Sequence, residues 1–370
     1  MNYKSAHISI IYSPASMSGV IKKITAMAKS TPSIDFYIIS PIERPRQNNL
    51  IFLTRDSSFK NKVLKYYGID KIVDFVKYNK IIIRYVGADH SLLMLSEKYK
   101  DKLIIEHHTK EINELKNRKL NLLFKFFQII NEIVYPRFIF PYLFKVTAVT
   151  NDILNYQKSR YIKSQNTAIK KFLVLPNGLN KNDFLDSKDI NIKRDDEFLE
   201  FVFVASNFSK WHGYDRLLKS LLCYTGSRKI KLNIVGLSEP LENNMVDSNV
   251  VILNHGMMDK QSLYDLLSSS DIAIDSLGLH RLGFSDSSTL KSRDYILNCL
   301  PIIASCHDSS LSSIRDYIYY AGNDETIIDF NSVIEWYAKL KLEELCNVYK
   351  NSVINTLDWG FVFKKIINDE

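Results

Sequence analysis

The segment GFSDSSTLKSRDYILNCLPIIAS, residues 283–305, indicates the fold of the second half of the chain and raises its main functional question. It begins as a loop of small and hydroxyl-bearing residues, continues as a helical pattern and ends in an apolar run typical of a buried strand. Leu290, Asp294 and Leu297 are spaced i, i+4, i+7 and therefore share one helix face. A carboxylate on that face is costly unless a specific partner satisfies it. Asp294 is thus either a ligand-binding acid or an acid turned outward to pair with Lys291, a contact worth about 0.3 kcal/mol.

The same alternation of apolar strands and helices runs through most of the chain, which predicts parallel sheets covered on both faces. The predicted strands are 7–12, 35–40, 50–54, 80–85, 102–108, 145–150, 171–178, 198–206, 229–236, 250–256, 271–276 and 301–305. The predicted helices include 57–77, 89–100, 110–135, 151–164, 212–225, 259–268 and 287–299. The polar stretch 179–197 has no sustained apolar period and predicts a connection between domains. We therefore expect an α/β protein with two consecutive doubly wound domains.

Length and composition agree with this prediction. A chain of 370 residues is too long for one ordinary core, and 46% hydrophobic with 24% charged residues is typical of a globular protein. The four cysteines form no CxxC pair and show no zinc or disulfide spacing, and MNYKSAHISIIYS is no signal peptide. We therefore expect a protein of the reducing cytoplasm, without disulfides.

The formal net charge of +8 fits three kinds of partner: nucleic acid, an anionic membrane surface or a polyanionic small substrate. Lysines and arginines are scattered, which argues against a nucleic-acid module. Residues 110–145 are the exception, with seven Lys/Arg, three Glu and many large apolar residues. No apolar run there approaches the roughly 20 residues that span a bilayer. The region is either a helix pair on the membrane surface or two amphipathic helices that pack on the sheet with a basic outer face.

The loops that follow the strands of the second domain hold unusual polar residues, and open α/β sheets bind ligands at this edge. A diphosphate would find free N–H groups and hydroxyls at the start of the 287–299 helix, and a full positive charge on Lys210. Asp294, roughly 7 Å further along the helix, could accept hydrogen bonds from two sugar hydroxyls. The Ser-Ser-Thr run equally fits a plain N-cap. The candidate donor-binding residues are Asn207, Lys210, His212, His255, Gly256, Ser287, Ser288, Thr289, Leu290 and Asp294.

Three motifs together resemble a known family. They are FSKWHGYDRLLKSL (208–221), LPNG (175–178), and LSSSDIAIDSLG (267–278) followed by STLKSRDYILNCLPIIAS (288–305). They look like retaining GT-B glycosyltransferases of the bacterial group 4 type. The resemblance implies two Rossmann-like domains facing a cleft, with donor nucleotide sugar in the second, acceptor in the first, and a final helix crossing back. The implied limits are 1–178, 198–345 and 346–370.

The resemblance also implies roles for individual residues. The family's E-x7-E motif falls on Asp286 and Asp294, with aspartate in place of both glutamates. Asp294 would hold the donor ribose, and Asp286 would lie near the donor sugar. Asn207 stands near the family's arginine position, which leaves Lys210 as the diphosphate contact. The chain has no Walker A or G-x-G-x-x-G motif, which argues against P-loop NTPases and dinucleotide oxidoreductases.

In the first domain, IIEHHTKE (104–111) resembles the strand end that delivers an active-site histidine. His108 fits that spacing better than His107, so the predicted catalytic residues are His108, Lys210 and Asp286. His107, Arg84 at the end of the preceding strand, and Gly19 in the first βα loop are predicted on the acceptor side. A loop histidine satisfied by backbone groups, and a glycine that serves only to turn the chain, are the structural alternatives.

The function implied by the resemblance is a metal-independent, retaining glycosyltransferase of surface-polysaccharide synthesis. The absence of a D-x-D triplet agrees with the metal independence. We expect no cofactor, no metal and a nucleotide-diphosphate sugar as donor, UDP being favoured over GDP. The acceptor would be a glycan or a lipid-linked saccharide, reached at the inner membrane surface through 110–145, and no nucleic acid is expected. Two alternatives share the architecture: a UDP-sugar 2-epimerase and a nucleotide-sugar-binding subunit without activity.

Overall fold

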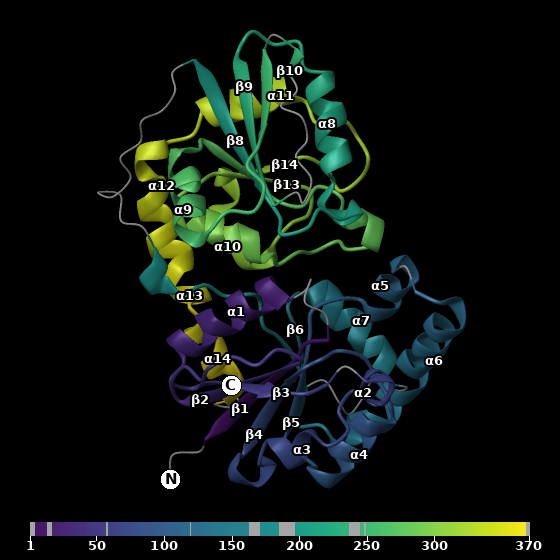
Figure 1. Ribbon diagram of the computed structural model, residues 1–370. Helices are drawn as coiled ribbons and strands as arrows, with labels where there is room; N and C mark the ends of the chain where they lie inside the picture. The colour runs from purple at the N-terminus through teal and green to yellow at the C-terminus, as the bar shows by residue number, and fades with distance from the viewer. Residues whose placement is uncertain are drawn as a thin grey trace. The chain divides into compact units, whose positions relative to one another are not determined.

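The computed structural model describes residues 4–12, 17–56, 58–118, 120–162, 171–184, 197–236, 245–247 and 249–367. The chain forms two compact units, residues 1–176 with 359–370, and residues 177–358 (Figure 1). Residues 346–358, assigned above to the returning segment, belong to the second unit. Part of the predicted 179–197 connection is also packed there, because Leu179 is buried in its core. Residues 185–196 of that connection lie outside the described residues.

The first unit contains a seven-stranded parallel sheet in the order β3-β2-β1-β4-β5-β6-β7. Its strands are β1 Ser5–Ile10, β2 Ile34–Ser40, β3 Leu50–Thr54, β4 Lys80–Arg84, β5 Leu103–His107, β6 Lys145–Ala148 and β7 Phe172–Val174. Ser5 of the central strand is in register with Ile34 on one side and Lys80 on the other. The predicted strands of this domain therefore all form.

Helices connect these strands, but two of the predicted helices are divided. The helices are α1 Met17–Ser30, α2 Phe59–Val63, α3 Ile69–Ile72, η2 Phe75–Lys77, α4 His90–Lys98, α5 Glu111–Asn117, α6 Leu122–Ile139, η3 Phe140–Tyr142, α7 Asn151–Tyr161 and α14 Trp359–Ile367. The predicted helix 57–77 is broken at Gly68, whose φ of 72° lies in the left-handed region. The predicted helix 110–135 ends at Asn117 and restarts after Asn121, which caps α6 through its side chain.

Alternating strand residues feed two cores, one on each face of this sheet. Ile81 and Ile83 of β4 lie in the core that contains residues of α4 and α7, whereas Ile82 lies in the opposite core with α1 and α14. Neighbouring residues on one strand point to opposite faces, so a strand buried on both sides needs a continuous apolar run. This requirement explains the Ile-Ile-Ile sequence of β4.

The C-terminal helix α14 packs against α1 in the first unit, as Figure 1 shows by the yellow ribbon beside the purple one. Trp359, Val362, Phe363 and Ile366 enter the same core as Ile24 and Met27 of α1. The ring of Phe363 meets Phe36 of β2 at 6.0 Å in an edge-to-face arrangement. The chain therefore ends by completing one face of the sheet with which it began.

The second unit holds a seven-stranded sheet in the order β10-β11-β9-β8-β12-β13-β14. Its strands are β8 Phe198–Val204, β9 Lys229–Val235, β10 Met245–Asp247, β11 Val250–Asn254, β12 Ile272–Ile274, β13 Ile302–Ala304 and β14 Ile318–Tyr320. Strand β10 is antiparallel to β11, and the other pairings are parallel. The short edge strands β10 and β14 were not predicted from the sequence.

The helices of this unit again cover both faces. They are η5 Lys181–Asp183, η6 Lys210–His212, α8 Tyr214–Leu222, α9 Lys260–Ser269, η7 Leu279–Leu282, α10 Leu290–Leu297, η8 Ser309–Tyr317, α11 Phe330–Ala338, α12 Leu342–Tyr349, the π-helical η9 Lys350–Ile354 and α13 Asn355–Leu357. Phe201 and Phe203 of β8 face the core with α8 and α11, while Val202 faces the core with α10 and α12. The fold is thus two doubly wound α/β units, as predicted.

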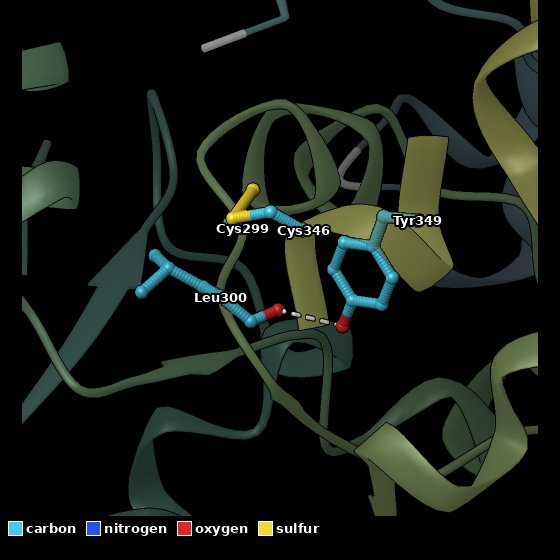
Figure 2. Close-up of a disulfide and its surroundings, with 4 residues drawn as sticks. All are labelled: Cys299, Leu300, Cys346 and Tyr349. Carbon is cyan, nitrogen blue, oxygen red and sulfur yellow. Dashed lines mark hydrogen bonds between the residues drawn. A yellow bond between two sulfur atoms is a disulfide. The ribbon is translucent and has the colours of Figure 1, made fainter. Parts of the chain in front are cut away.

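One prediction about the cysteines is wrong. Cys299 and Cys346 form a disulfide that joins the end of α10 to α12 (Figure 2). Beside it, the hydroxyl of Tyr349 donates to the carbonyl of Leu300 at 2.9 Å. The two cysteines are 47 residues apart, and only the packing of α12 on α10 makes them neighbours. The spacing of the cysteines along the chain therefore did not reveal this pairing.

Two phenylalanines of α14 allow a matched test of this closing helix. Phe363→Ala should lower the free energy of unfolding by about 3–5 kcal/mol, because its ring is buried in the α1–α14 core. Phe361→Ala, on the exposed side, should change it by no more than about 0.5 kcal/mol. Urea denaturation followed by circular dichroism measures both. Equal effects of the two substitutions would contradict the packing described.

Candidate functional site

The carboxyl ends of the strands in the second unit approach one another closely at glycines. A Cβ on Gly236, whose φ is +106°, would lie 1.6 Å from the carbonyl oxygen of Ala205 after β8. The N–H of Gly236 donates to the carbonyl of Gly256 after β11 at 2.7 Å. No atom lies within 4 Å of the Cβ position of Gly256 itself. The predicted site residue Gly256 therefore borders open space at the edge where a ligand of this sheet would bind.

The KWHG loop after β8 is joined by backbone hydrogen bonds to the loop after β12. The N–H of Leu277 donates to the carbonyl of His212 at 2.8 Å, and the N–H of Gly278 donates to that of Trp211 at 3.2 Å. Gly213 permits this approach, because its φ is +72° and a Cβ would lie 2.7 Å from the Leu277 carbonyl carbon. The side chains of Asn207 and Lys210 are exposed on this loop. Two of the predicted contact residues are thus held on a fixed backbone with their side chains in solvent.

The two predicted histidines of this unit are both held as neutral imidazoles. Nδ1 of His212 accepts from the N–H of Ser209 at 2.9 Å, and burial, together with the charge of Lys291, lowers the pKa of His212 to about 3. Nε2 of His255 lies 2.9 Å from Oδ1 of the buried Asn233, and burial lowers the pKa of His255 as well. At neutral pH each ring therefore offers hydrogen bonds but no charge.

The start of α10 uses the predicted hydroxyls within the protein. Thr289 is the N-cap: its Oγ1 accepts from the N–H of Ser292 at 3.2 Å and donates to Oδ2 of Asp275 at 2.7 Å. The N–H of Ser287 donates to the carbonyl of His307 at 2.8 Å, and Oγ of Ser288 accepts from the N–H of Asn177 at 2.9 Å. The N-cap alternative therefore holds for Thr289, and the serines join neighbouring loops.

The guanidinium of Arg293 on α10 holds these loops together. Its side chain is 2% exposed and donates to the Asn177 carbonyl at 2.7 Å and to Asp308 Oδ2 at 2.8 Å. Its Nη2 also donates to Ser288 Oγ at 2.8 Å and to Ser310 Oγ at 2.9 Å. This buried cation is charge-paired and multiply hydrogen-bonded, the condition under which burial is tolerated. Asn177 of the LPNG stretch contributes its backbone carbonyl to this network, and its side-chain amide donates to the carbonyl of Ser288.

The two predicted acids occupy different places. Both carboxylate oxygens of Asp286 lie 3.1 Å from Ser309, the first residue of η8, and accept from its N–H and its hydroxyl. Asp294 is half-buried on α10, as is Leu290 in the first turn. The alternative in which Asp294 pairs with Lys291 is wrong, because the ammonium of Lys291 has no hydrogen-bond partner among the described residues.

Lys291 is a residue that the sequence analysis treated only as a partner for Asp294. Its ammonium is buried, lies 5.0 Å from the centre of the Phe203 ring, and feels the nearby charge of Asp275. Burial lowers the pKa of Lys291 to about 8 and raises that of Asp275 above its ordinary value. The signal in the sequence that could have identified Lys291 is its position in the first turn of α10, the helix whose start is the predicted diphosphate site.

In the first unit, the predicted His108 belongs to a buried cluster around Glu106 at the end of β5. Nε2 of His7 lies 3.0 Å from the Glu106 carboxylate, Nζ of Lys23 lies 3.3 Å from it, and Nε2 of His108 lies 3.1 Å from it. Burial lowers the pKa of the predicted Arg84 as well, and the Glu106 charge opposes that shift. Glu106, His7 and Lys23 were not predicted from the sequence, because they lie on three separate elements, β5, β1 and α1.

His108 is neutral in this cluster. Its Nδ1 lies 3.4 Å from the Lys23 ammonium, and burial, reinforced by Arg84, lowers the pKa of His108 to about 3. Burial also lowers the pKa of Lys23 to about 8, while the neighbouring lysine and histidines hold the pKa of Glu106 well below its usual value. The cluster therefore presents one carboxylate and several donors, with a neutral imidazole 15% exposed at its edge.

His107 and Gly19 lie elsewhere. His107 is fully buried: its Nδ1 lies 2.5 Å from Glu111 Oε1 and its Nε2 3.1 Å from the Tyr161 hydroxyl. Gly19 lies in the first turn of α1 rather than in the preceding loop, which is a correction, and its Cβ position is open. Residues 13–16 of that loop lie outside the described residues.

Two features are absent from the described ranges. No group of three or more His, Cys, Asp or Glu side chains in them could hold a metal ion. No helix in them is both long enough and apolar enough to cross a bilayer.

Comparison with known proteins places the fold. No protein-family model and no curated protein matches the chain. Among solved structures, a glycosyltransferase from Rickettsia africae ESF-5 matches at 15% identity and a TM-score of 0.64, over 99% of this chain and 97% of that one. WaaG, a glycosyltransferase involved in lipopolysaccharide biosynthesis, matches at 12% identity and 0.65, over 97% and 99%. HepE from Anabaena, in complex with UDP and glucose, matches at 11% identity and 0.60, over 98% of each chain.

These likenesses extend over nearly the whole chain at a low identity, so they establish the architecture. The predicted fold class, an α/β protein of GT-B type with two Rossmann-like domains, is confirmed. The roles of the individual site residues stay predictions.

The buried neutral imidazole of His108 makes a testable contribution to stability. In the unfolded chain a histidine titrates near pH 6.5, whereas folded His108 stays neutral until about pH 3, so the unfolded state binds one more proton between these values. Stability is therefore lost as the pH falls from 6 to 4.5. His108→Gln should make this slope shallower by about 1.4 kcal/mol per pH unit in urea denaturation. Above pH 7 the two proteins should show parallel curves; identical slopes below pH 6 would contradict the assignment.

Proposed function

We propose that this protein is a glycosyltransferase that moves a sugar from a nucleotide-diphosphate donor, UDP being favoured, to a glycan or lipid-linked saccharide. Transfer would retain the anomeric configuration, need no metal and serve surface-polysaccharide synthesis. The observation that carries the proposal is the second unit's strand edge, where the exposed Lys210, the buried Lys291 and the start of α10 gather positive charge. A fold shared with glycosyltransferases, one of them solved with UDP and glucose, supports it.

The chemistry depends on the charge that develops on the leaving group. Departure of a nucleoside diphosphate leaves negative charge on its oxygens, and fixed cations and helix N–H groups stabilise that charge. Lys210 and the first turn of α10 would perform this role, with Lys291 behind them. Asp294, half-buried further along α10, would accept hydrogen bonds from the ribose hydroxyls. Neutral His108 of the first unit, whose imidazole is 15% exposed, would contact the donor sugar, a role that needs no titration at neutral pH.

Asp286 is the weakest of the predicted catalytic residues, because Ser309 already engages both of its oxygens. An epimerase or an inactive subunit would bind the nucleotide sugar at the same strand ends of the second unit. The two differ from a transferase in what happens to the bound donor. Incubation with UDP-sugar alone separates them: a sugar epimer formed without acceptor indicates the epimerase, and binding without hydrolysis or transfer indicates the subunit.

We also propose that α6 lies on the inner surface of the cell membrane. The outward face of this helix is apolar, rather than the basic face expected for helices packed on the sheet. The exposed side chains are Leu122, Leu123, Phe126, Phe127, Ile130, Ile133, Val134 and Phe138. Lys116, Arg118 and Arg137 are exposed beside them, and the one acid of α6, Glu132, is buried against Arg160. An apolar face flanked by cations and free of exposed acid complements an anionic bilayer.

The donor site is tested by replacing one exposed lysine. Lys210→Ala should lower kcat about 100-fold with a UDP-sugar donor, since removal of one charge-stabilising group costs about 3 kcal/mol in the barrier. Lys219→Ala, an exposed lysine of α8, should leave the rate unchanged. Release of UDP in the presence of EDTA measures the reaction. A metal requirement, or equal rates for the two variants, would contradict the proposed mechanism.

Membrane contact is tested with a second matched pair. Leu123→Glu, at a side chain 81% exposed on α6, should lower co-sedimentation with vesicles of phosphatidylglycerol at least tenfold, because it places a charge in the apolar face. Leu222→Glu, at a leucine 67% exposed on α8, should bind as the parent protein does. Vesicles of phosphatidylcholine serve as the uncharged control. Equal losses in both variants would contradict docking through α6.

A further inference from the structure

A pocket of about 530 Å³ lies in the first unit, separate from the Glu106 cluster. It is formed by α5, by α6 from Phe124 to Glu132, and by the segments around residues 62–65 and 85–87. Its lining is Tyr12, Lys62, Lys65, Tyr85, Val86, Gly87, Thr109, Glu111, Glu114, Leu115, Arg118, Leu120, Phe124, Gln128 and Glu132. The volume is in the range of small-molecule sites, and the wall combines charged, hydroxyl and apolar groups.

The carboxylates in this wall already have partners. Glu111 accepts from Gln157 at 2.8 Å and from Arg160 at 2.7 Å. Glu132 accepts from the Tyr85 hydroxyl and the Ala88 N–H, each at 2.7 Å, and is paired with Arg160. Glu114 is paired with Arg118. Because these carboxylates are already hydrogen-bonded and charge-paired, they do not require a cationic ligand.

Lys65 is different, because its backbone is fixed while its ammonium is not engaged. Its N–H donates to Asp89 at 2.8 Å, and its carbonyl accepts from the Tyr12 hydroxyl at 2.8 Å. The residue is 8% exposed, yet no hydrogen bond or ion pair joins its ammonium to any described residue of the chain. An ammonium that lines a pocket without a hydrogen-bond partner in the described part of the protein is available to an anionic ligand.

Gly87 makes room for this ammonium at the pocket wall. Its φ is +128°, a conformation that favours glycine, and a Cβ there would lie 2.7 Å from Lys65 Nζ. The side chain of Lys65 is thereby placed against the loop after β4, facing the pocket that both residues line. Lys62, exposed on α2, and Arg118 stand in the same lining.

We propose that this pocket binds the phosphate or diphosphate group of the acceptor, with Lys65 as its main contact and Lys62 and Arg118 beside it. Arg118 and Arg160 are paired with the three glutamates, which leaves Lys62 and Lys65 as the cations that a negative ligand would meet. This inference depends on the proposed function in one respect, namely that the ligand of the pocket is the acceptor of a glycosyltransferase. The class of acceptor it names is a saccharide joined through a phosphate ester to an apolar chain.

The apolar residues of the pocket wall are the reason for proposing an apolar chain on the ligand. Leu115, Leu120 and Phe124 line the pocket, and Leu120 is exposed next to Leu122 and Leu123 of the α6 apolar face. A hydrocarbon leaving the pocket on this side would pass directly onto that face. The pocket and the proposed membrane-facing side of α6 are thus continuous.

Isothermal titration calorimetry of the full-length protein tests the site, with UDP saturating so that the donor edge is filled. The probes are geranyl diphosphate, inorganic pyrophosphate and geraniol. Geranyl diphosphate should bind most tightly, and Lys65→Met should weaken both diphosphates at least tenfold, whereas Lys65→Arg should keep most of the affinity. The matched control is Lys145→Met, because Lys145 is buried to the same 8% at the start of β6, the opposite end of the sheet.

Each outcome decides a part of the inference. Unchanged binding in Lys65→Met, or geraniol binding as tightly as geranyl diphosphate, overturns it. If pyrophosphate binds as tightly as geranyl diphosphate, the anion site is supported and the proposal that the ligand carries an apolar chain is contradicted. If Lys65→Met does not fold, Arg118→Gln, at an exposed side chain, should still weaken the diphosphates severalfold. Since calorimetry needs no turnover, loss of transferase activity and loss of anion binding are separate results.

Discussion

Burial of every central strand on both faces is the constraint that governs the arrangement of this protein. Parallel strands need crossover helices, and those helices cover both sides of each sheet, so the strand interiors must be apolar. The triple isoleucine of β4 and the alternation of Phe201, Val202 and Phe203 in β8 satisfy that requirement. Polar side chains that act on a ligand are then confined largely to the strand ends and the helix starts beside them.

Buried cations stabilise these strand ends, and the two units use them differently. In the second unit Arg293 is fully hydrogen-bonded and fixes the loops around α10, so it belongs to the scaffold. The ammonium of Lys291, two residues earlier, is buried without a hydrogen-bond partner among the described residues, and the ammonium of Lys65 in the first unit lines a pocket. A satisfied cation holds a backbone in place, whereas an unsatisfied one is better explained by a ligand that brings negative charge.

The apolar face of α6 gives the first unit a third property. Most apolar side chains of the long helices are turned into a core, but along α6 they line the outside from Leu122 to Phe138. The polar residues that would normally cover such a helix are buried instead: Glu132 is paired with Arg160 and hydrogen-bonded to Tyr85. The helix α6 therefore turns its one acid toward the protein interior and most of its apolar residues toward the outside.

The sequence by itself determined the α/β class, the two doubly wound halves and the strand ends at which ligands should bind. It did so because apolar periodicity and helix caps are local, and a few neighbouring residues suffice to read them. Tertiary structure alone decided which polar groups meet. Glu106 gathers His7, Lys23 and His108 from three elements, Cys299 finds Cys346 across 47 residues, and Asp286 binds Ser309. Such contacts depend on how separate elements pack, and no spacing along the chain encodes that distance.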